Sequence, residues 1–136
     1  MSFDSELKAL LRKHEGWRNK PYIDTVGKMT IGCGRNLSDR GLDDSEIMFL
    51  LEKDIVITMA DLLSIFPNFM DFSDRRRMAL ISLAFIGKER LLTFKKMIQA
   101  IKGGDWHKAA DEVIDSKYAA QVGHRAVEIA SMLTEG

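Results

Sequence analysis

The spacing of apolar residues changes once along the chain, from a mixed pattern to a purely helical one. Apolar residues recur every three to four positions over residues 2–13, which predicts an amphipathic helix that Gly16 ends. Residues 21–33 differ, because β-branched and aromatic residues flank a polar turn in which Gly27 can adopt a positive φ. This segment predicts a β-hairpin.

From residue 43 to the end, every apolar pattern has the period of a helix. Residues 43–65 predict one long helix that begins at acidic residues and ends near Pro67. Further helices are expected, one capped by Ser73 and others over residues 91–101, 106–114 and 125–133. Because the strand patterns lie within the first 40 residues, the chain predicts an α+β fold with its strands segregated from most of its helices.

Composition places the chain among soluble globular proteins of about one domain. It has 136 residues, of which 46% are apolar and 29% charged, and its formal net charge is zero. Balanced charge gives no reason to expect nucleic acid as a partner. No apolar run approaches the roughly 18 residues of a membrane-spanning helix, and the first residues are charged where a signal peptide is apolar. We therefore expect a protein made in the cytoplasm without stable membrane insertion.

Two acidic residues near the N-terminus stand in contrasting surroundings. If the first helix continues for one more turn, Glu15 lies on its apolar stripe, four residues after Leu11. Partial burial and the negative end of the helix then favour a protonated carboxyl, as a general acid requires. Asp24 precedes a turn whose amides favour the ionised form, and Thr30 across the hairpin can hold a water against it. This contrast is typical of an acid and its partner, but carboxylates at helix ends and turns are also common for structural reasons.

Several motifs in the same segment match one family of enzymes. The motifs are HEG at residues 14–16, YxD at 22–24 and GxxTIGxG at 27–34. They resemble the signature of the phage-type lysozymes, glycoside hydrolase family 24, which includes the T-even phage enzyme. Later segments resemble the helical lobe of that family, namely RRRMALISLAF at 75–85, FKKM at 94–97, GDWHKAADEV at 104–113 and QVGHRA at 121–126. The resemblance covers nearly the whole chain.

The resemblance implies a lysozyme-like fold of two lobes joined by a long helix. One lysozyme domain then occupies residues 1–136. Its parts are a small N-terminal lobe with a helix and a β-hairpin over 1–42, the connecting helix over 43–66, and a helical C-terminal lobe over 67–136. The substrate cleft of the family lies between the lobes.

The resemblance also implies a substrate and a division of roles. The substrate is the glycan strand of bacterial peptidoglycan, cleaved at the β-1,4 bond between N-acetylmuramic acid and N-acetylglucosamine. Glu15 matches the residue that protonates the leaving oxygen, and Asp24 with Thr30 matches the residues that position or activate the attacking water. The family implies no cofactor and no metal. We expect a monomer that reaches the cell wall once a separate protein has opened the membrane, and that then lyses the cell.

The chain departs from the family pattern in three places. Only Ile86 separates Phe85 from Gly87, where the family commonly has two residues, one of them polar. The family places the residue that matches Phe85 near the substrate, whereas its apolar helix predicts the core, and a place on the cleft floor satisfies both. Arg35 stands where the family often has a histidine, so any ion pair there has a different partner. The segment 37–43 is shorter than in the T-even phage enzyme.

Other reactive residues fit structural roles better. Cys33 is the only cysteine, so the chain has no intrachain disulfide, and we expect a small buried side chain rather than a nucleophile paired with a histidine. The three histidines lack the spacing of a metal site. Residues 75–77 are three arginines that predict a solvated helix face rather than a phosphate site. Trp106 is expected to pack in the core rather than against a sugar.

Two functions other than hydrolysis are compatible with these patterns. A peptidoglycan-binding or assembly domain binds the strand without turnover, and the altered segment around Ile86 is the feature that favours it. A lytic transglycosylase breaks the same bond but closes a 1,6-anhydro ring without water. Asp24 and Thr30 argue against this second function, because a transglycosylase needs no group that positions water.

Overall fold

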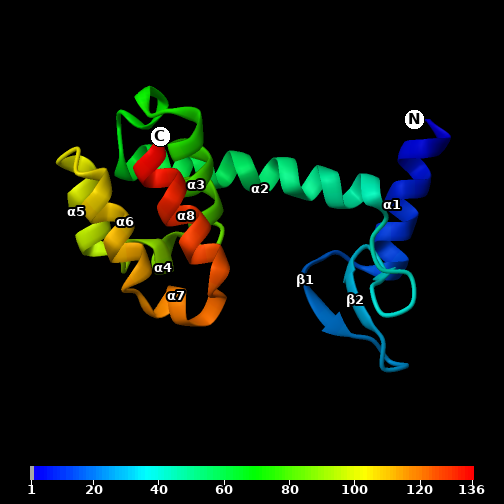
Figure 1. Ribbon diagram of the computed structural model, residues 1–136. Coiled ribbons are helices and arrows are strands. Elements are labelled where there is room, and N and C mark those ends of the chain that lie inside the picture. Colours follow the sequence, from blue (N-terminus) through cyan, green and yellow to red (C-terminus); the bar gives the residue numbers. More distant parts are fainter. Residues whose placement is uncertain (1) are drawn as a thin grey trace. The chain divides into compact units, whose positions relative to one another are not determined.

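Two units make up the chain, one up to Phe49 and the other from Leu50 onward. The computed structural model describes residues 2–136 (Figure 1). We call the two parts the first unit and the second unit. A small antiparallel sheet lies in the first unit and the second unit is helical, which confirms the predicted α+β class.

The first unit begins with helix α1, Phe3–Glu15. The Ser2 hydroxyl caps it by accepting a hydrogen bond from the Ser5 N–H at 3.2 Å. The helix reaches Glu15, two residues beyond the predicted end at residue 13, and Gly16 at φ 88° leads the chain out of it. No residue of α1 is buried, so the prediction of a buried apolar stripe is wrong for the structure described here.

Three strands follow in the order β1-β2-β3, namely Arg18–Ile23, Met29–Gly32 and Arg35–Asn36. The first two form the predicted hairpin, with Ile23 opposite Met29 across the turn. The third strand was not predicted, because two residues are too few to show an alternating pattern.

Cys33 lies between the second and third strands and is exposed, so the prediction of a small buried side chain is wrong. The reason is the backbone on either side of it. Gly32 and Gly34 have φ values of 69° and 74°, which end β2 one residue before the cysteine and turn the chain. The Gly-Cys-Gly segment is therefore a turn and not the continuation of a strand.

The long helix α2, Asp44–Ile65, confirms the prediction for residues 43–65. Its start is a reciprocal cap. The Asp43 carboxylate accepts a hydrogen bond from the Glu46 N–H at 2.9 Å, and the Glu46 carboxylate accepts one from the Asp43 N–H at 3.0 Å. The boundary between the two units falls within this helix, after Phe49.

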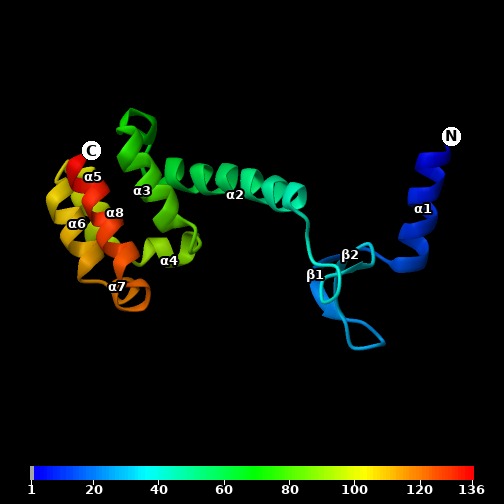
Figure 2. The same cartoon turned by 45° about the vertical axis from the view of Figure 1, so that its right-hand side comes forward.

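The second unit is a bundle of short helices around an apolar core. They are η1 Phe69–Asp71, α3 Asp74–Ala84, α4 Lys88–Leu92, α5 Lys95–Lys102, α6 Trp106–Ile114, α7 Lys117–Val122 and α8 His124–Glu135. Helix α8 packs against α3 and α6, and α6 also packs against α5 (Figures 1 and 2). Leu62, Phe66, Leu80, Leu83 and Leu133 are among the side chains that these contacts bury completely or nearly so.

Two helices differ from the sequence-based prediction. The segment 91–101 is split into α4 and α5, because Phe94 leaves the helical conformation, with a ψ of 55°. Helix α7 was not predicted, since six residues between Ser116 and Gly123 give too short a pattern. Its Ser116 cap accepts a hydrogen bond from the Ala119 N–H at 3.2 Å.

Two further residues of this unit test the predicted core. Trp106 packs edge-on against Phe72, at 4.9 Å between ring centroids, which confirms its place in the core. Phe85 follows the last residue of α3 and is 43% exposed, so the helix pattern was wrong to place it in the core. Arg76 stacks on Trp106 and donates to the Leu133 carbonyl at 2.8 Å, so the predicted solvated face does not include it.

No helix among residues 2–136 is both long and apolar enough to cross a membrane. Within the same residues, no group of three or more His, Cys, Asp or Glu side chains is arranged to hold a metal ion.

Candidate active site

Glu15 is the last residue of α1, and its side chain lies against the backbone of Gly34. A Cβ atom at position 34 would be 3.0 Å from Glu15 Oε2 and 3.2 Å from its Cβ and Cγ. Any side chain at this position would therefore displace Glu15, and the φ of 74° favours glycine as well. The turn after β2 thus forms a glycine surface on which the Glu15 side chain rests.

The surroundings of the Glu15 carboxyl differ from those predicted. Its side chain is exposed in this structure, so the expected partial burial is not observed. Among residues 2–136, no hydrogen bond or ion pair engages this carboxyl. The side chain occupies the space that a Cβ atom at position 34 would need, and its oxygens are available for a ligand.

Asp24 is held in the opposite way, by hydrogen bonds on one of its oxygens. Its Oδ1 accepts from the Val26 N–H at 3.0 Å and from the Lys28 N–H at 2.8 Å. Two backbone bonds close the same turn, from Asp24 N–H to the Lys28 carbonyl at 2.9 Å and from Gly27 N–H to the Asp24 carbonyl at 3.1 Å. The Asp24 carboxylate is therefore locked in the turn with Oδ2 free of these backbone bonds.

Thr30 lies beside that second oxygen, as predicted from the hairpin. Its hydroxyl is 3.5 Å from Asp24 Oδ2 and 3.1 Å from the Lys28 carbonyl oxygen. One hydroxyl proton can be donated to only one of these acceptors at a time, and the shorter distance favours the carbonyl. Thr30 is only 4% exposed, so its hydroxyl is held in place beside Asp24.

Taken together, the first unit presents two carboxyl groups of different character. Glu15 has an unpaired carboxyl that can donate a proton, while Asp24 has an anchored carboxylate next to a hydroxyl that can orient a small polar molecule. The three predicted residues Glu15, Asp24 and Thr30 all belong to the first unit. Phe85, the predicted substrate-binding residue, belongs to the second.

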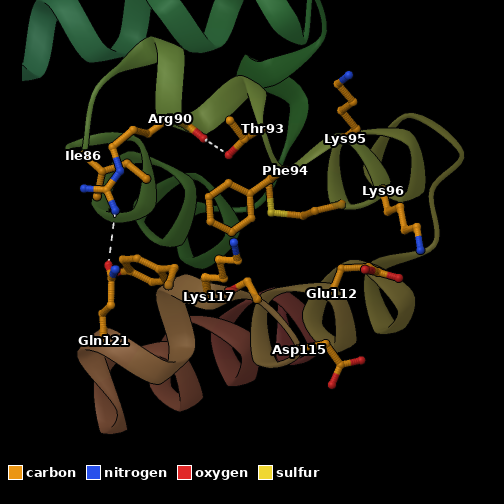
Figure 3. Close-up of a pocket in the computed structure, with 13 residues that line it drawn as sticks. Ile86, Arg90, Thr93, Phe94, Lys95, Lys96, Glu112, Asp115, Lys117 and Gln121 are labelled. Atoms are coloured by element: carbon orange, nitrogen blue, oxygen red, sulfur yellow. Dashed lines mark hydrogen bonds between the residues drawn. The ribbon is translucent and has the colours of Figure 1, made fainter.

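A pocket of about 590 Å³ lies in the second unit and was not predicted from the sequence (Figure 3). Its walls come from the connection between α3 and α4, from α4 and α5, and from α6 and α7, so no single segment carries a recognisable signal. Arg90 donates to the Gln121 side-chain oxygen at 3.2 Å and closes one end. Ile86, the residue of the shortened segment, lines the pocket too.

The chemistry of this pocket suits an anionic group. Its lining includes four cationic and two acidic side chains, namely Arg90, Lys95, Lys96 and Lys117 with Glu112 and Asp115. Lys117 points toward the Phe94 ring in the middle of the pocket, whereas Lys95 points away (Figure 3). No ion pair within residues 2–136 involves any of the four cations. The three lysines therefore have no ionic partner among the described residues, whereas Arg90 is hydrogen-bonded to Gln121.

Comparison with known proteins places these features in a family. The chain matches the family model described as phage lysozyme over residues 12–129. Probable T4-type lysozymes 1 and 2 of Dictyostelium discoideum are each 26% identical to it, and each alignment covers 97% of this chain and 95% of the relative. These alignments extend over 162 and 163 residues, more than the 136 of this chain, so the relatives contain residues that it lacks.

A third relative is the pre-baseplate central spike protein Gp5 of Enterobacteria phage T4. It is 28% identical over 93% of this chain, which corresponds to 27% of that protein's own length. The family match, by contrast, begins within α1 and ends within α8, and so includes the glutamate, the hairpin and most of the helical unit. The chain therefore belongs to the phage lysozyme family and is a glycoside hydrolase that acts on peptidoglycan.

Proposed function

We propose that the protein is an N-acetylmuramidase that hydrolyses the β-1,4 bond between N-acetylmuramic acid and N-acetylglucosamine. The observation that carries this proposal is the contrast between the two carboxyl groups of the first unit. Glu15 is unpaired on the Gly34 surface, and Asp24 is anchored by two backbone amides beside the Thr30 hydroxyl. Hydrolysis of a glycosidic bond needs one carboxylic acid and one carboxylate.

In this proposal Glu15 donates its proton to the oxygen of the leaving sugar. Because no internal partner competes for its oxygens, the acid can meet the substrate directly. Asp24 Oδ2 then orients a water, with the Thr30 hydroxyl as a second contact, and the carboxylate stabilises the positive charge that develops on the sugar ring. The backbone hydrogen bonds on Oδ1 keep Asp24 oriented throughout.

The two alternative functions predict different products. A lytic transglycosylase leaves 1,6-anhydro ends, for which the Asp24 and Thr30 arrangement has no use. A binding or assembly domain releases no product. The altered segment around Ile86, the feature in favour of binding alone, lies in the second unit and does not change the three residues of the first.

The biological role that follows is that of an endolysin. Its action on the wall would lyse the bacterial host once a separate protein has let it through the membrane. The proposed partner is the glycan strand of peptidoglycan, bound by a monomer.

The test is a lysis assay on permeabilised Gram-negative cells with Glu15→Gln. We expect this substitution to abolish clearing while the thermal unfolding midpoint stays unchanged, because the side chain keeps its shape on Gly34 and has no partner to lose. Glu6→Gln is the matched control, since it neutralises an exposed carboxylate of the first turn of the same helix. Glu6→Gln should clear cells as fast as the parent. Equal rates for Glu15→Gln and the parent would show that Glu15 is not the acid.

A further inference from the structure

Arg35 connects the turn that supports Glu15 to the start of the long helix. It is the first residue of β3 and follows Gly34 directly. Its Nη2 forms an ion pair with Glu46 Oε2, and its Nη1 donates to the Gly41 carbonyl oxygen at 3.3 Å. One guanidinium group therefore holds two points of the segment that leads from β3 into α2.

Glu46 is itself fixed from its other side. Its Oε1 accepts the Asp43 N–H at 3.0 Å, while Asp43 Oδ1 accepts the Glu46 N–H at 2.9 Å and the Ser45 hydroxyl at 2.7 Å. The hydrogen bond from Arg35, followed by the bond from the Asp43 amide, lowers the pKa of Glu46 below its usual value. The hydrogen bond from Ser45 is the largest cause of the lowered pKa of Asp43. Arg35 thus binds a carboxylate that is already oriented by the helix cap.

We infer that the Arg35–Glu46 ion pair is a positioning device for Glu15, acting through the backbone of Gly34. This inference rests on the proposed role of Glu15 as the acid. Arg35 follows Gly34 directly, so the bonds that its side chain makes to Glu46 and Gly41 restrain the backbone at Gly34. The Glu15 side chain in turn occupies the space that a Cβ atom at position 34 would need. The short strand β3 pairs with β2 at two positions, and the residues after it add hydrogen bonds between Met29 and both Leu37 and Ser38. The Arg35 side chain adds the ties from this segment to Gly41 and to the start of α2.

Burial separates this ion pair from an ordinary surface pair. The side chains of Arg35 and Glu46 are 22% and 30% exposed, whereas those of Arg75 and Glu135 in the second unit are 47% and 62% exposed. Both pairs join arginine to glutamate, but only the first lies next to a residue that touches Glu15. Exposed pairs contribute little to stability, so Arg75–Glu135 provides a matched comparison.

The experiment compares Arg35→Ala, Arg35→Lys and Arg75→Ala in the full chain, with kcat and KM measured on soluble peptidoglycan fragments. We expect Arg35→Ala to lower kcat about tenfold to a hundredfold with KM little changed, because a displacement of about 1 Å at a catalytic group has effects of this size. Arg35→Lys keeps the charge and one of the two contacts, so it should recover most of the lost kcat. Arg75→Ala should leave kcat unchanged.

Amide hydrogen exchange at Leu37 separates this inference from the proposed function, because it needs no activity. The Leu37 N–H donates to the Met29 carbonyl at 2.7 Å and so reports how firmly the segment that contains Gly34 and Arg35 is held to β2. We expect exchange at Leu37 to rise in Arg35→Ala and to stay unchanged in Arg75→Ala. If Arg35→Ala fails to fold, Glu46→Gln gives the same test. The new amide oxygen can still accept the Asp43 N–H, while the negative charge that pairs with Arg35 is lost. Parental kcat, or parental exchange at Leu37, in the folded variant would overturn the positioning role. A parental rate in Glu15→Gln would instead overturn the proposed function and leave the exchange result intact.

Discussion

Each of the two units is stabilised internally by a different kind of interaction. Every buried apolar side chain within residues 2–136 lies at Leu62 or beyond, in the second unit, whereas Thr30 is the only buried residue of the described part of the first unit. The first unit is fixed instead by a three-stranded sheet, the Asp24 turn and the Arg35–Glu46 ion pair. All three residues proposed to act on the glycosidic bond belong to this polar unit.

This difference indicates a division of labour between stability and chemistry. Apolar burial is the main favourable term in folding, so the second unit should supply most of the folding free energy. Hydrogen bonds and glycine turns contribute less to stability, but they set the orientation and position of side chains. Glu15 and Asp24 need this positioning in order to act on a substrate. Substitutions in the first unit should therefore change the rate more than the stability, and those in the second unit should do the reverse.

After the loss of activity expected for Glu15→Gln, the largest expected effect is that of Asp24→Asn on the rate. The amide oxygen of the new side chain can still accept from the Val26 and Lys28 N–H groups, so the turn is kept while the charge is lost. We expect kcat to fall about 10²–10⁴-fold, the range that a positioned base contributes, with the thermal midpoint unchanged. A loss of less than threefold in steady-state assays on peptidoglycan fragments would reduce Asp24 to a structural role.

A pair of leucine substitutions compares the two units in stability. Leu80 is fully buried in the second unit, and we expect Leu80→Ala to lower the free energy of unfolding by about 2–5 kcal/mol. Leu10 in α1 is 47% exposed, so Leu10→Ala should change it by less than about 0.5 kcal/mol. Urea denaturation measures both. Equal losses in the two variants would mean that the apolar face of α1 is buried in solution and that the contrast between the units is wrong.

The Thr30 hydroxyl should have a smaller effect on the rate than Asp24. Thr30→Val removes the hydroxyl but keeps the shape of this buried side chain, which is 4% exposed. The Lys28 carbonyl loses the bond from the hydroxyl but keeps the one from the Asp24 N–H, so it is not left without a partner. We expect kcat to fall about tenfold, the worth of one hydrogen bond to a charged group or to the water it holds. Thr30→Ser is the control and should retain most of the activity. Identical rates for the valine variant and the parent would remove Thr30 from the reaction.

The smallest expected effect is a pH dependence of stability in the first unit. The pKa of Glu46 is lowered from its usual 4.5, chiefly by the hydrogen bond from Arg35. A carboxyl whose pKa is lower in the folded than in the unfolded protein stabilises the fold at pH values above its unfolded pKa. This stabilisation is lost as the pH falls through the folded pKa. The difference in thermal midpoint between the parent and Arg35→Ala should therefore be constant from neutral pH to about 4.5 and shrink below it. A difference that stays constant in more acidic buffer would contradict the ion pair.

Sequence patterns predicted the elements whose signals are long or local. The helix over 43–65 has six turns of apolar period, and the hairpin is marked by its glycine turn, so both appear as predicted. The position of Thr30 beside Asp24 also followed from the hairpin, because cross-strand neighbours are fixed by the turn. These predictions needed no information about tertiary contacts.

The features that were missed depend on contacts between distant segments or on single backbone angles. The split between α4 and α5 depends on the backbone angle at Phe94, and the exposure of Cys33 depends on two positive φ values. The partner of Arg35 comes from the next helix, and the pocket of the second unit is assembled from several helices. The glycine surface under Glu15 belongs to the same class, because the motif gives the glycine but not what touches it.

Digestion of purified peptidoglycan in water enriched in heavy oxygen, followed by mass spectrometry of the released fragments, tests the proposed reaction most directly. We expect the parent protein to yield reducing ends that carry one heavy oxygen, and Glu15→Gln to yield none above background. Anhydro ends from the parent, or labelled reducing ends formed at the parental rate by Glu15→Gln, would contradict hydrolysis by Glu15 with a water held at Asp24.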